Sequence, residues 1–155
     1  MDSSVRIRKA TAADRPFVLE TAERLADFEL PPWRQAEDVI ATEVGVLEKV
    51  FETLGEAALY IAETEAGDPL GFLYLERHTD YFTRQPHGHV SMVALAREAE
   101  GRGAGKALMQ TAEDWARDNG LPYLALNVFG LNTRARALYE RLGYAPDTVK
   151  YLKVL

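Results

Sequence analysis

The residues best suited to chemistry lie in EGRGAGKAL at 100–108, where three glycines stand at alternate positions and a helical apolar pattern follows. Glycine is a poor helix former, so this crowding indicates that something approaches the backbone closely. The first N–H groups of a helix have no partner within it, and the helix dipole places partial positive charge there. Arg102 and Lys106 add positive charge. The stretch therefore predicts a pyrophosphate site.

Two common phosphate-binding motifs do not fit this stretch. In the Walker A pattern, Glu100 stands where the first glycine is required, and Ala107 follows the lysine where serine or threonine is required. In a GxGxxG loop read from Gly103, Leu108 replaces the third glycine. A nucleotide-binding protein that uses this loop for ATP or NAD stays an alternative, disfavoured by the spacing.

Size and composition limit the classes of protein that the chain could belong to. Its 155 residues, 47% of them hydrophobic, predict a single domain over 1–155 with a real core. The net charge of −6 disfavours a broad nucleic-acid surface. The chain has no cysteine, which excludes disulfides, thiolate zinc sites and cysteine nucleophiles. No apolar run spans a bilayer and the N-terminus lacks the apolar segment of a signal peptide, so we expect a soluble, cytoplasmic protein with no membrane partner.

Hydrophobic periodicity and turn residues predict the elements that position the glycine stretch. Strands are expected over 5–8, 57–64, 70–78, 89–95, 123–129 and 148–155. Helices are expected over 11–29, over 36–54 with Gly55 as the C-cap, from the glycine stretch to Gly120, and over 132–144. This order predicts one mixed α/β sheet with helices on its faces.

Two segments resemble a known family. VALAREAEGRGAGKAL (93–108) is similar to the acetyl-CoA loop of the GCN5-related N-acetyltransferases (GNAT), whose pattern is (Arg/Gln)-x-x-Gly-x-(Gly/Ala), with Gly103 and Gly105 at the two small positions. LNVFGLNTRARALYERLGY (126–144) resembles the family's closing segment. Glu100 departs from the pattern, since it replaces the usual Arg or Gln. The resemblance implies the acyl-CoA N-acyltransferase fold: a mixed sheet of six to seven strands with helices on both faces, splayed between the fourth and fifth strands.

The resemblance also implies the cofactor and how it is held. Acetyl-CoA would be the acyl donor, and no metal would be needed. Its pantetheine arm would pair with backbone groups of Val93, Ala94 and Leu95, and an N–H near Val93 would polarise the thioester carbonyl. The pyrophosphate would rest on the N–H groups of six consecutive residues: Gly101, Arg102, Gly103, Ala104, Gly105 and Lys106.

Two residues of the closing segment have two interpretations each. Asn132 matches a position that often bonds the cofactor, but asparagine is also a good N-cap for the last helix. Tyr139 matches the tyrosine that the family uses to protonate the departing thiolate, although it also borders the apolar stripe of its helix. The resemblance implies that Tyr139 contacts the cofactor and acts as the catalytic acid.

His89 is the candidate catalytic base, because it lies where some relatives carry a glutamate and because histidine has a suitable pKa. Strand alternation predicts that His89, Ser91 and Val93 face the same side. Two alternatives remain open. His89 could simply be a packed, hydrogen-bonded residue of the strand, and a chain of water molecules could take the place of a single base. The HGH at 87–89 lacks a third clustered ligand, so no metal site is expected.

The acceptor would be a small-molecule or peptide amine that attacks the thioester directly, because a cysteinyl intermediate is excluded. Phe28, Trp33 and Tyr81 are aromatic residues near the expected acceptor site, although packing in the core or in a loop explains each of them better than contact with a substrate. A non-catalytic acyl-CoA sensor of the same fold is the alternative function. Homodimers are common in the family, which leaves the oligomeric state open, and the sequence does not identify the acceptor.

Overall fold

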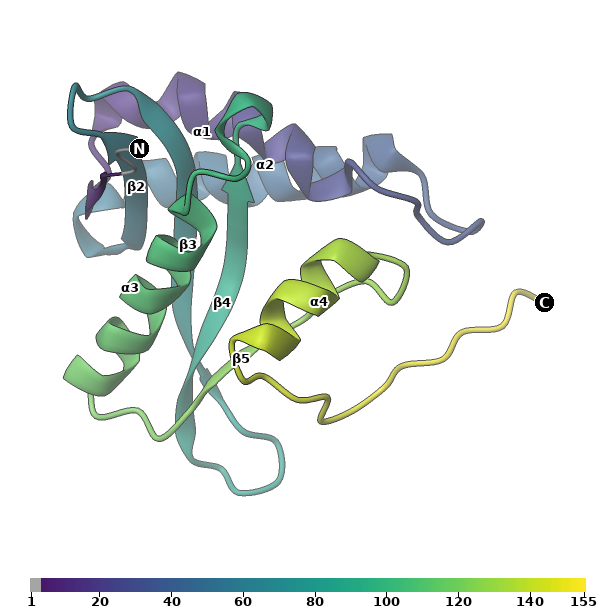
Figure 1. The fold of residues 1–155 in the computed structure, drawn as a ribbon. Coiled ribbons are helices and arrows are strands. Elements are labelled where there is room, and N and C mark those ends of the chain that lie inside the picture. The colour runs from purple at the N-terminus through teal and green to yellow at the C-terminus, as the bar shows by residue number, and fades with distance from the viewer. Residues whose placement is uncertain (1–3) are drawn as a thin grey trace.

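A five-stranded sheet forms the centre of the molecule in the computed structural model, which describes residues 4–155 (Figure 1). Its strands lie in the order β1-β2-β3-β4-β5, and all neighbours are antiparallel except the parallel pair β4 and β5. The strands are β1 (Val5–Lys9), β2 (Ala58–Thr64), β3 (Pro69–Thr79), β4 (Pro86–Leu95) and β5 (Leu124–Leu126). The mixed α/β sheet expected from the sequence is confirmed.

One face of the sheet is covered by α1 (Arg15–Thr21) and α2 (Ala36–Glu52). The 3-10 turns η1 (Ala12–Asp14) and η2 (Ala22–Ala26) flank α1, and η3 (Leu54–Glu56) follows α2. A capping box of Thr11 and Asp14 begins this segment, and Pro16 occupies the first turn of α1, where its missing N–H costs nothing. The first buried cluster joins these helices to the sheet through Val18, Leu47 and Phe72, among others.

The opposite face is covered by α3 (Ala104–Asp118), with α4 (Thr133–Arg141) beside it. Ala104, Leu108 and Ala112 recur at helical spacing and are fully buried against the sheet, as their period predicts. Tyr139 and Leu142, from α4 and its end, pack against the same second cluster. The two clusters put helices on both faces of the sheet, as expected.

A β-bulge changes which side chains of β4 share a face. Tyr74 pairs with Met92 and Leu75 pairs with Val90, so Ser91 is an extra residue on its strand. Val93 packs in the cluster on the α3 side, whereas His89 pairs with Glu76 on the other face. The expectation that His89 and Val93 face the same side is therefore wrong, because the inserted residue reverses the alternation.

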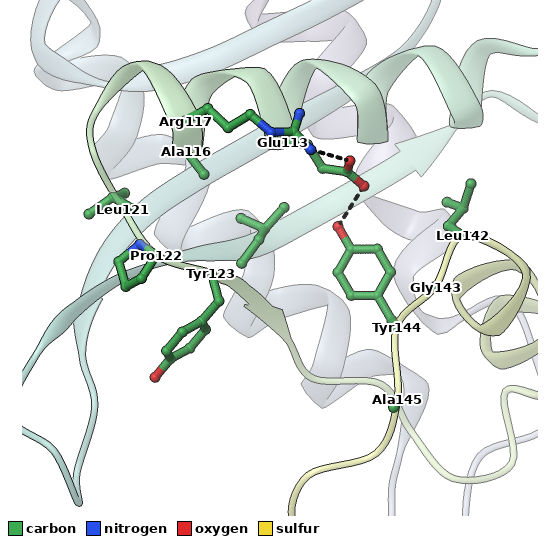
Figure 2. A pocket seen from close by; sticks show the side chains of 11 residues that line it. Glu113, Ala116, Arg117, Leu121, Pro122, Tyr123, Leu142, Gly143, Tyr144 and Ala145 are labelled. Atoms are coloured by element: carbon green, nitrogen blue, oxygen red, sulfur yellow. Dashed lines mark hydrogen bonds and ion pairs between the residues drawn. The ribbon is translucent and has the colours of Figure 1, made fainter.

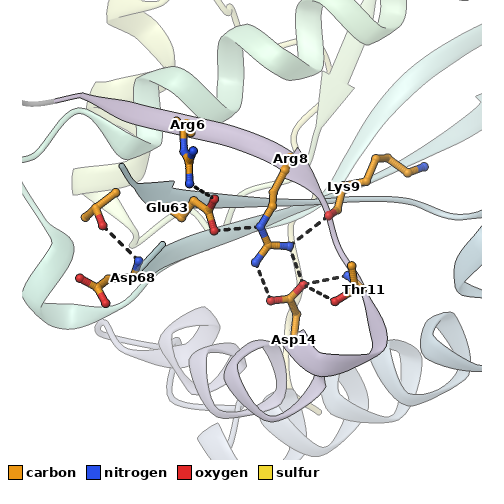
Figure 3. A network of polar contacts seen from close by, with 8 residues as sticks. Arg6, Arg8, Lys9, Thr11, Asp14, Glu63 and Asp68 are labelled. Atoms are coloured by element: carbon orange, nitrogen blue, oxygen red, sulfur yellow. Dashed lines mark hydrogen bonds and ion pairs between the residues drawn. The ribbon is translucent and has the colours of Figure 1, made fainter. Parts of the chain in front are cut away.

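An ion-pair network ties β1 to the first helical turn and to β2 (Figure 3). The Arg8 guanidinium donates to both carboxylate oxygens of Asp14, at 2.8 and 2.9 Å, and to Glu63 at 2.8 Å. Arg6 also donates to Glu63. Asp14 and Glu63 are both buried, so these hydrogen bonds satisfy carboxylates that would otherwise be costly to desolvate.

Three expectations from the sequence are corrected. The described residues form five strands rather than six to seven, because 148–155 adopts no strand. β5 covers 124–126 rather than 123–129. Gly55 does not cap α2, which ends at Glu52 with Thr53 as its C-cap, because Gly55 lies in the 3-10 turn η3 that follows. Across the described part of the chain, every helix is too short or too polar to cross a membrane.

Candidate active site

The glycine stretch forms an open turn that leads into α3. After β4 the chain makes the 3-10 turn η4 (Arg97–Ala99), and Gly101 and Gly103 then adopt left-handed φ values of 81° and 84°. Gly103 is the N-cap of α3, so no side chain caps the first N–H groups of the helix. A Cβ placed on either glycine would have no heavy atom within 4 Å, so the space in front of the turn is open. The turn fits a diphosphate approaching uncapped N–H groups.

Glu100, the residue that departs from the family pattern, is held between two arginines. Arg24 of η2 donates to its carboxylate, and Arg134 Nη1 of α4 lies 3.0 Å from Glu100 Oε1. Arg24 also donates through Nε to the Leu95 carbonyl at 3.1 Å. The negative charge beside the turn is thus paired on both sides. Sequence reasoning missed Arg24, because nothing in the local pattern links η2 to a residue 76 positions away.

The pairing of β4 with β5 is short. It joins Gly88 with Leu124, His89 with Ala125 and Val90 with Leu126, whereas β4 continues to Leu95. The predicted pantetheine-binding residues 93–95 therefore lie beyond the end of this pairing. The Leu95 carbonyl already accepts the hydrogen bond from Arg24, so it is the least available of these backbone groups.

The closing segment places Asn132 and Tyr139 at opposite ends of α4. Asn132 Oδ1 accepts a hydrogen bond from Ala135 N at 3.3 Å, which confirms the N-cap interpretation. Tyr139 is partly buried against the second cluster, and its ring centroid lies 6.2 Å from that of Tyr144. Burial raises the pKa of Tyr139 above its usual value, so its hydroxyl is protonated at neutral pH and is a weaker acid than an exposed phenol.

His89 belongs to a polar cluster on the face opposite Tyr139. Its ring stacks on His78 with 4.2 Å between centroids, and its backbone pairs with that of Glu76. Burial, followed by the charges of His78 and His87, lowers the pKa of His89, while Glu76 opposes them. The neutral, proton-accepting form of His89 is therefore favoured at neutral pH.

Glu76 is the centre of that cluster. Ser91 Oγ donates to its Oε1, Tyr74 Oη donates to its Oε2 at 3.2 Å, and His78 Nε2 lies 3.4 Å away. Burial opposes the charged form of Glu76, but the hydrogen bonds from Ser91, His78 and Tyr74 outweigh it and hold the pKa of this carboxyl below its usual range. Sequence reasoning missed Glu76 and His78, although their alternation with Tyr74 in LYLERH could have placed the three on one face.

The expected acceptor residues do not lie together. Phe28 packs on Phe129, which follows β5, with 5.6 Å between ring centroids. Trp33 lies in the connection between η2 and α2, and 43% of it is exposed. Tyr81 lies in the loop between β3 and β4, at the opposite end of the sheet from that connection, and 81% of it is exposed (Figure 1). Of these three residues, only Phe28 lies beside the segment that follows β5, through its contact with Phe129.

Within residues 4–155, no three His, Cys, Asp or Glu side chains are grouped so that they could hold a metal ion. The rings of His78, His87 and His89 are close because they pack on one another. His78 packs edge-on against His87, with 6.1 Å between ring centroids, and it stacks on His89.

Comparisons with known proteins agree on one family. The chain matches the model described as "Acetyltransferase (GNAT) family" over residues 20–144. It is 28% identical over 144 residues to the "Uncharacterized N-acetyltransferase YhfO" of Bacillus subtilis (strain 168), covering 93% of this chain and 92% of that protein. It is 35% identical over 89 residues to the mycothiol acetyltransferase of Renibacterium salmoninarum, covering 57% of this chain and 26% of that protein. The chain thus matches about a quarter of the length of that relative.

Among solved structures, a GCN5-related N-acetyltransferase from Ralstonia eutropha JMP134 has a TM-score of 0.74 at 20% identity, covering 97% of this chain and 99% of the other. A ribosomal-protein-alanine N-acetyltransferase from Brucella melitensis biovar Abortus 2308 has a TM-score of 0.68 at 21% identity, covering 98% of this chain and 100% of the other. At these identities the likeness concerns the fold.

Proposed function

Since this chain belongs to the acetyltransferase (GNAT) family and is an acetyl-transfer enzyme, we propose that it moves the acetyl group of acetyl-CoA to a primary amine. The amine attacks directly within a ternary complex, because the chain has no cysteine to carry the acetyl group. The observation that carries the proposal is the open left-handed turn at Gly101 and Gly103, which exposes the uncapped N–H groups of α3.

Binding of the donor is assigned to backbone groups. The N–H groups of 101–106 hold the diphosphate, with favourable charge from Arg102 and Lys106. The pairing of β4 with β5 covers three residue pairs, which supports a splay of the two strands beyond Val90, and in this proposal β4 offers Val93 and Ala94 to the pantetheine arm as it would to another strand. Acetyl-CoA supplies the activated thioester, and a backbone N–H near Val93 polarises its carbonyl. Asn132 contributes its amide next to this arm while its Oδ1 caps α4.

Tyr139 is proposed as the general acid for the departing thiolate. A tyrosine hydroxyl carries its proton at neutral pH, and burial raises the pKa of Tyr139 further, so Tyr139 acts on the thiolate as a positioned hydrogen-bond donor and not as a strong acid. A thiolate whose conjugate acid has a pKa near ~8.5 leaves more readily when a positioned hydroxyl donates to it. Tyr139 packs against the second cluster, which restricts the movement of its ring.

His89 is proposed as the proton acceptor. An alkylammonium group has a pKa near ~10.4, so the acceptor must lose a proton before it can attack. The lowered pKa of His89 keeps its ring neutral and able to accept. Tyr139 packs on one face of the sheet and His89 lies on the other, so in this proposal Tyr139 donates to the departing sulfur from one side of the β4–β5 pair, and His89 takes the proton of the amine nitrogen from the other.

Thiol release tests this function. Acetyl-CoA is incubated with a panel of amines that includes peptides with free N-termini, lysine, polyamines, aminoglycosides and small amines, and free CoA is measured. Acetylated product together with stoichiometric CoA release supports the proposal. If acetyl-CoA raises the melting temperature but no amine in the panel releases CoA, the acyl-CoA sensor is favoured instead, and if ATP or NAD alone raises it, the nucleotide alternative is favoured.

A further inference from the structure

An exposed arginine of α4 is paired with the carboxylate next to the glycine turn. Arg134 Nη1 lies 3.0 Å from Glu100 Oε1, yet the Arg134 side chain is 77% exposed. Arg24, the other partner of Glu100, has a side chain that is 20% exposed and also donates to Asp27 and to the Leu95 carbonyl. Among the described residues, Glu100 is the one side-chain partner of Arg134. Arg134 is therefore free to leave, while Arg24 keeps Glu100 paired.

The surroundings of this ion pair carry an excess of positive charge. Within residues 4–155, the segment 97–106 and its ion-pair partners have more basic side chains than acidic ones. The basic ones are Arg24, Arg97, Arg102, Lys106 and Arg134, and the acidic ones are Asp27, Glu98 and Glu100. Because the chain as a whole has a net charge of −6, this local excess favours binding of an anion at the segment.

The donor of the proposed reaction has one phosphate group more than the turn is assigned to hold. The N–H groups of 101–106 take the diphosphate, which leaves the phosphate monoester on the 3′ position of the ribose. A phosphate monoester has a charge of about −1.5 to −2 at pH 7 and three acceptor oxygens. A guanidinium binds such a group through two parallel hydrogen bonds. The 3′-phosphate is therefore a stronger ligand for Arg134 than the single negative charge of Glu100.

The other end of α4 does not suit this phosphate. A groove of about 370 Å³ lies there, lined by α3, β5 and the residues that follow α4 (Figure 2). At its polar side the Glu113 carboxylate accepts a hydrogen bond from Tyr144 Oη at 3.3 Å and lies 3.5 Å from Arg117 Nη2. A phosphate in the groove would lie beside a carboxylate whose cation is already paired, whereas at the first turn of α4 it lies among cations in excess.

We propose that Arg134 exchanges Glu100 for the 3′-phosphate of the donor, an inference that rests on acetyl-CoA being the donor. Before binding, Glu100 occupies the guanidinium of Arg134 as an internal anion. As the diphosphate binds to the turn, the 3′-phosphate replaces the carboxylate, and Glu100 keeps its pair with Arg24. The exchange costs little, because an exposed ion pair contributes little to stability and no charge is left without a counter-ion. A ligand that has the diphosphate but no 3′-phosphate gains nothing from Arg134.

Binding of two ligands that differ only by this phosphate tests the exchange. Isothermal titration calorimetry gives the Kd of coenzyme A and of 3′-dephospho-coenzyme A, and the unmodified protein is expected to bind coenzyme A about tenfold more tightly. In Arg134→Gln the preference is expected to fall to about twofold, while the Kd of 3′-dephospho-coenzyme A stays unchanged. Arg141→Gln is the matched control, because it removes the same charge from the exposed last turn of α4 and should keep the preference.

A double-mutant cycle separates the exchange from simple charge attraction. Glu100→Gln frees Arg134, so the affinity for coenzyme A is expected to rise more than the affinity for 3′-dephospho-coenzyme A. In the Arg134→Gln background the same change should raise both affinities equally, because only the loss of repulsion between Glu100 and the phosphates remains. If the rise for coenzyme A is the same with and without Arg134, Glu100 acts by its charge alone and the exchange is overturned.

Failure of the exchange and failure of the proposed function give different results. Equal Kd values for the two ligands in the unmodified protein, or a preference that Arg134→Gln leaves intact, overturn the exchange while the donor assignment is kept. A parallel loss of affinity for both ligands in Arg134→Gln also overturns it, since Arg134 then supports the turn instead of binding the phosphate. If neither ligand binds the unmodified protein, the donor assignment itself fails, and the exchange fails with it.

Discussion

The rings of His78 and His89 stack with 4.2 Å between their centroids and 12° between their planes, although the residues belong to different strands. The contact forms because the bulge at Ser91 turns His89 to the face that carries Tyr74 and Glu76. Burial lowers the pKa of His89, and the charge of a second histidine at this distance lowers it further. The environment of the proposed base is therefore set by its neighbours on β3.

The pH dependence of catalysis tests that environment. Because burial and the His78 charge lower the pKa of His89, the acidic limb of kcat/KM is expected below the ordinary histidine value of about 6.5. His78→Phe keeps a stacked ring but removes a positive charge, so the pKa of His89 rises and the limb moves to higher pH. Arg77→Gln, on the same strand but the other face, should leave the limb in place. A limb that is unchanged in His89→Gln contradicts the role of His89.

Replacing Tyr139 by Phe tests the acid. Loss of the hydroxyl is expected to lower kcat about 100-fold, within the usual range for general acid catalysis, while the Kd for acetyl-CoA changes little. Initial rates of CoA release and equilibrium binding separate the two effects. Tyr144→Phe is the control, because its hydroxyl donates to Glu113 instead. Unchanged kcat in Tyr139→Phe would exclude the acid role.

The open turn is tested by substituting its glycines. Gly103→Val is expected to raise the KM for acetyl-CoA at least about tenfold, because a branched side chain enters the space in front of the N–H groups. Part of the effect is strain from the left-handed φ of 84°. Gly67→Val is the control for this strain. Gly67 has a φ of 92° and equally open surroundings, but it lies in the turn between β2 and β3, away from the proposed donor site. Equal losses in both variants would remove the turn from the donor site.

Glu100→Gln tests the departure from the family pattern. The change removes one negative charge beside the diphosphate site and frees Arg24 and Arg134, so the Kd for acetyl-CoA is expected to fall about threefold at low salt. The gain should shrink at high salt, since these side chains are partly exposed. Glu98→Gln, in the exposed η4 turn, should have little effect. Weaker binding in Glu100→Gln would mean that its ion pairs are needed to shape the turn.

Stability at low pH depends on the network around Arg8. Asp14→Asn is expected to cost about 2 kcal/mol of unfolding free energy at neutral pH, because it breaks a buried charge pair. The hydrogen bond from Arg8 holds the pKa of Asp14 below its usual value against the effect of burial. This stabilisation is therefore complete above about pH 4 and is lost as the pH falls through the lowered pKa. Urea melts at several pH values should show the mutant and the unmodified protein converging in acid, with the exposed Asp68→Asn as the control.

Local sequence was sufficient for the elements whose reasons are local. The glycine turn leading into α3, the N-cap at Asn132 and the apolar stripe of α3 follow from backbone freedom, capping chemistry and helical period, none of which needs distant residues. The same holds for the family assignment, since the two motifs that carry it are short and continuous.

The tertiary structure decided what depends on pairing between distant segments. The bulge at Ser91 is invisible in the alternation of its own strand and appears only against β3, which is why the shared face of His89 and Val93 was predicted incorrectly. The pairing of Glu100 with Arg24 joins segments 76 residues apart, so no local pattern could indicate it. The strand pattern of 148–155 is visible in the sequence, but a strand forms only when its backbone pairs with a sheet edge, and in the structure this segment runs away from the sheet and pairs with no strand.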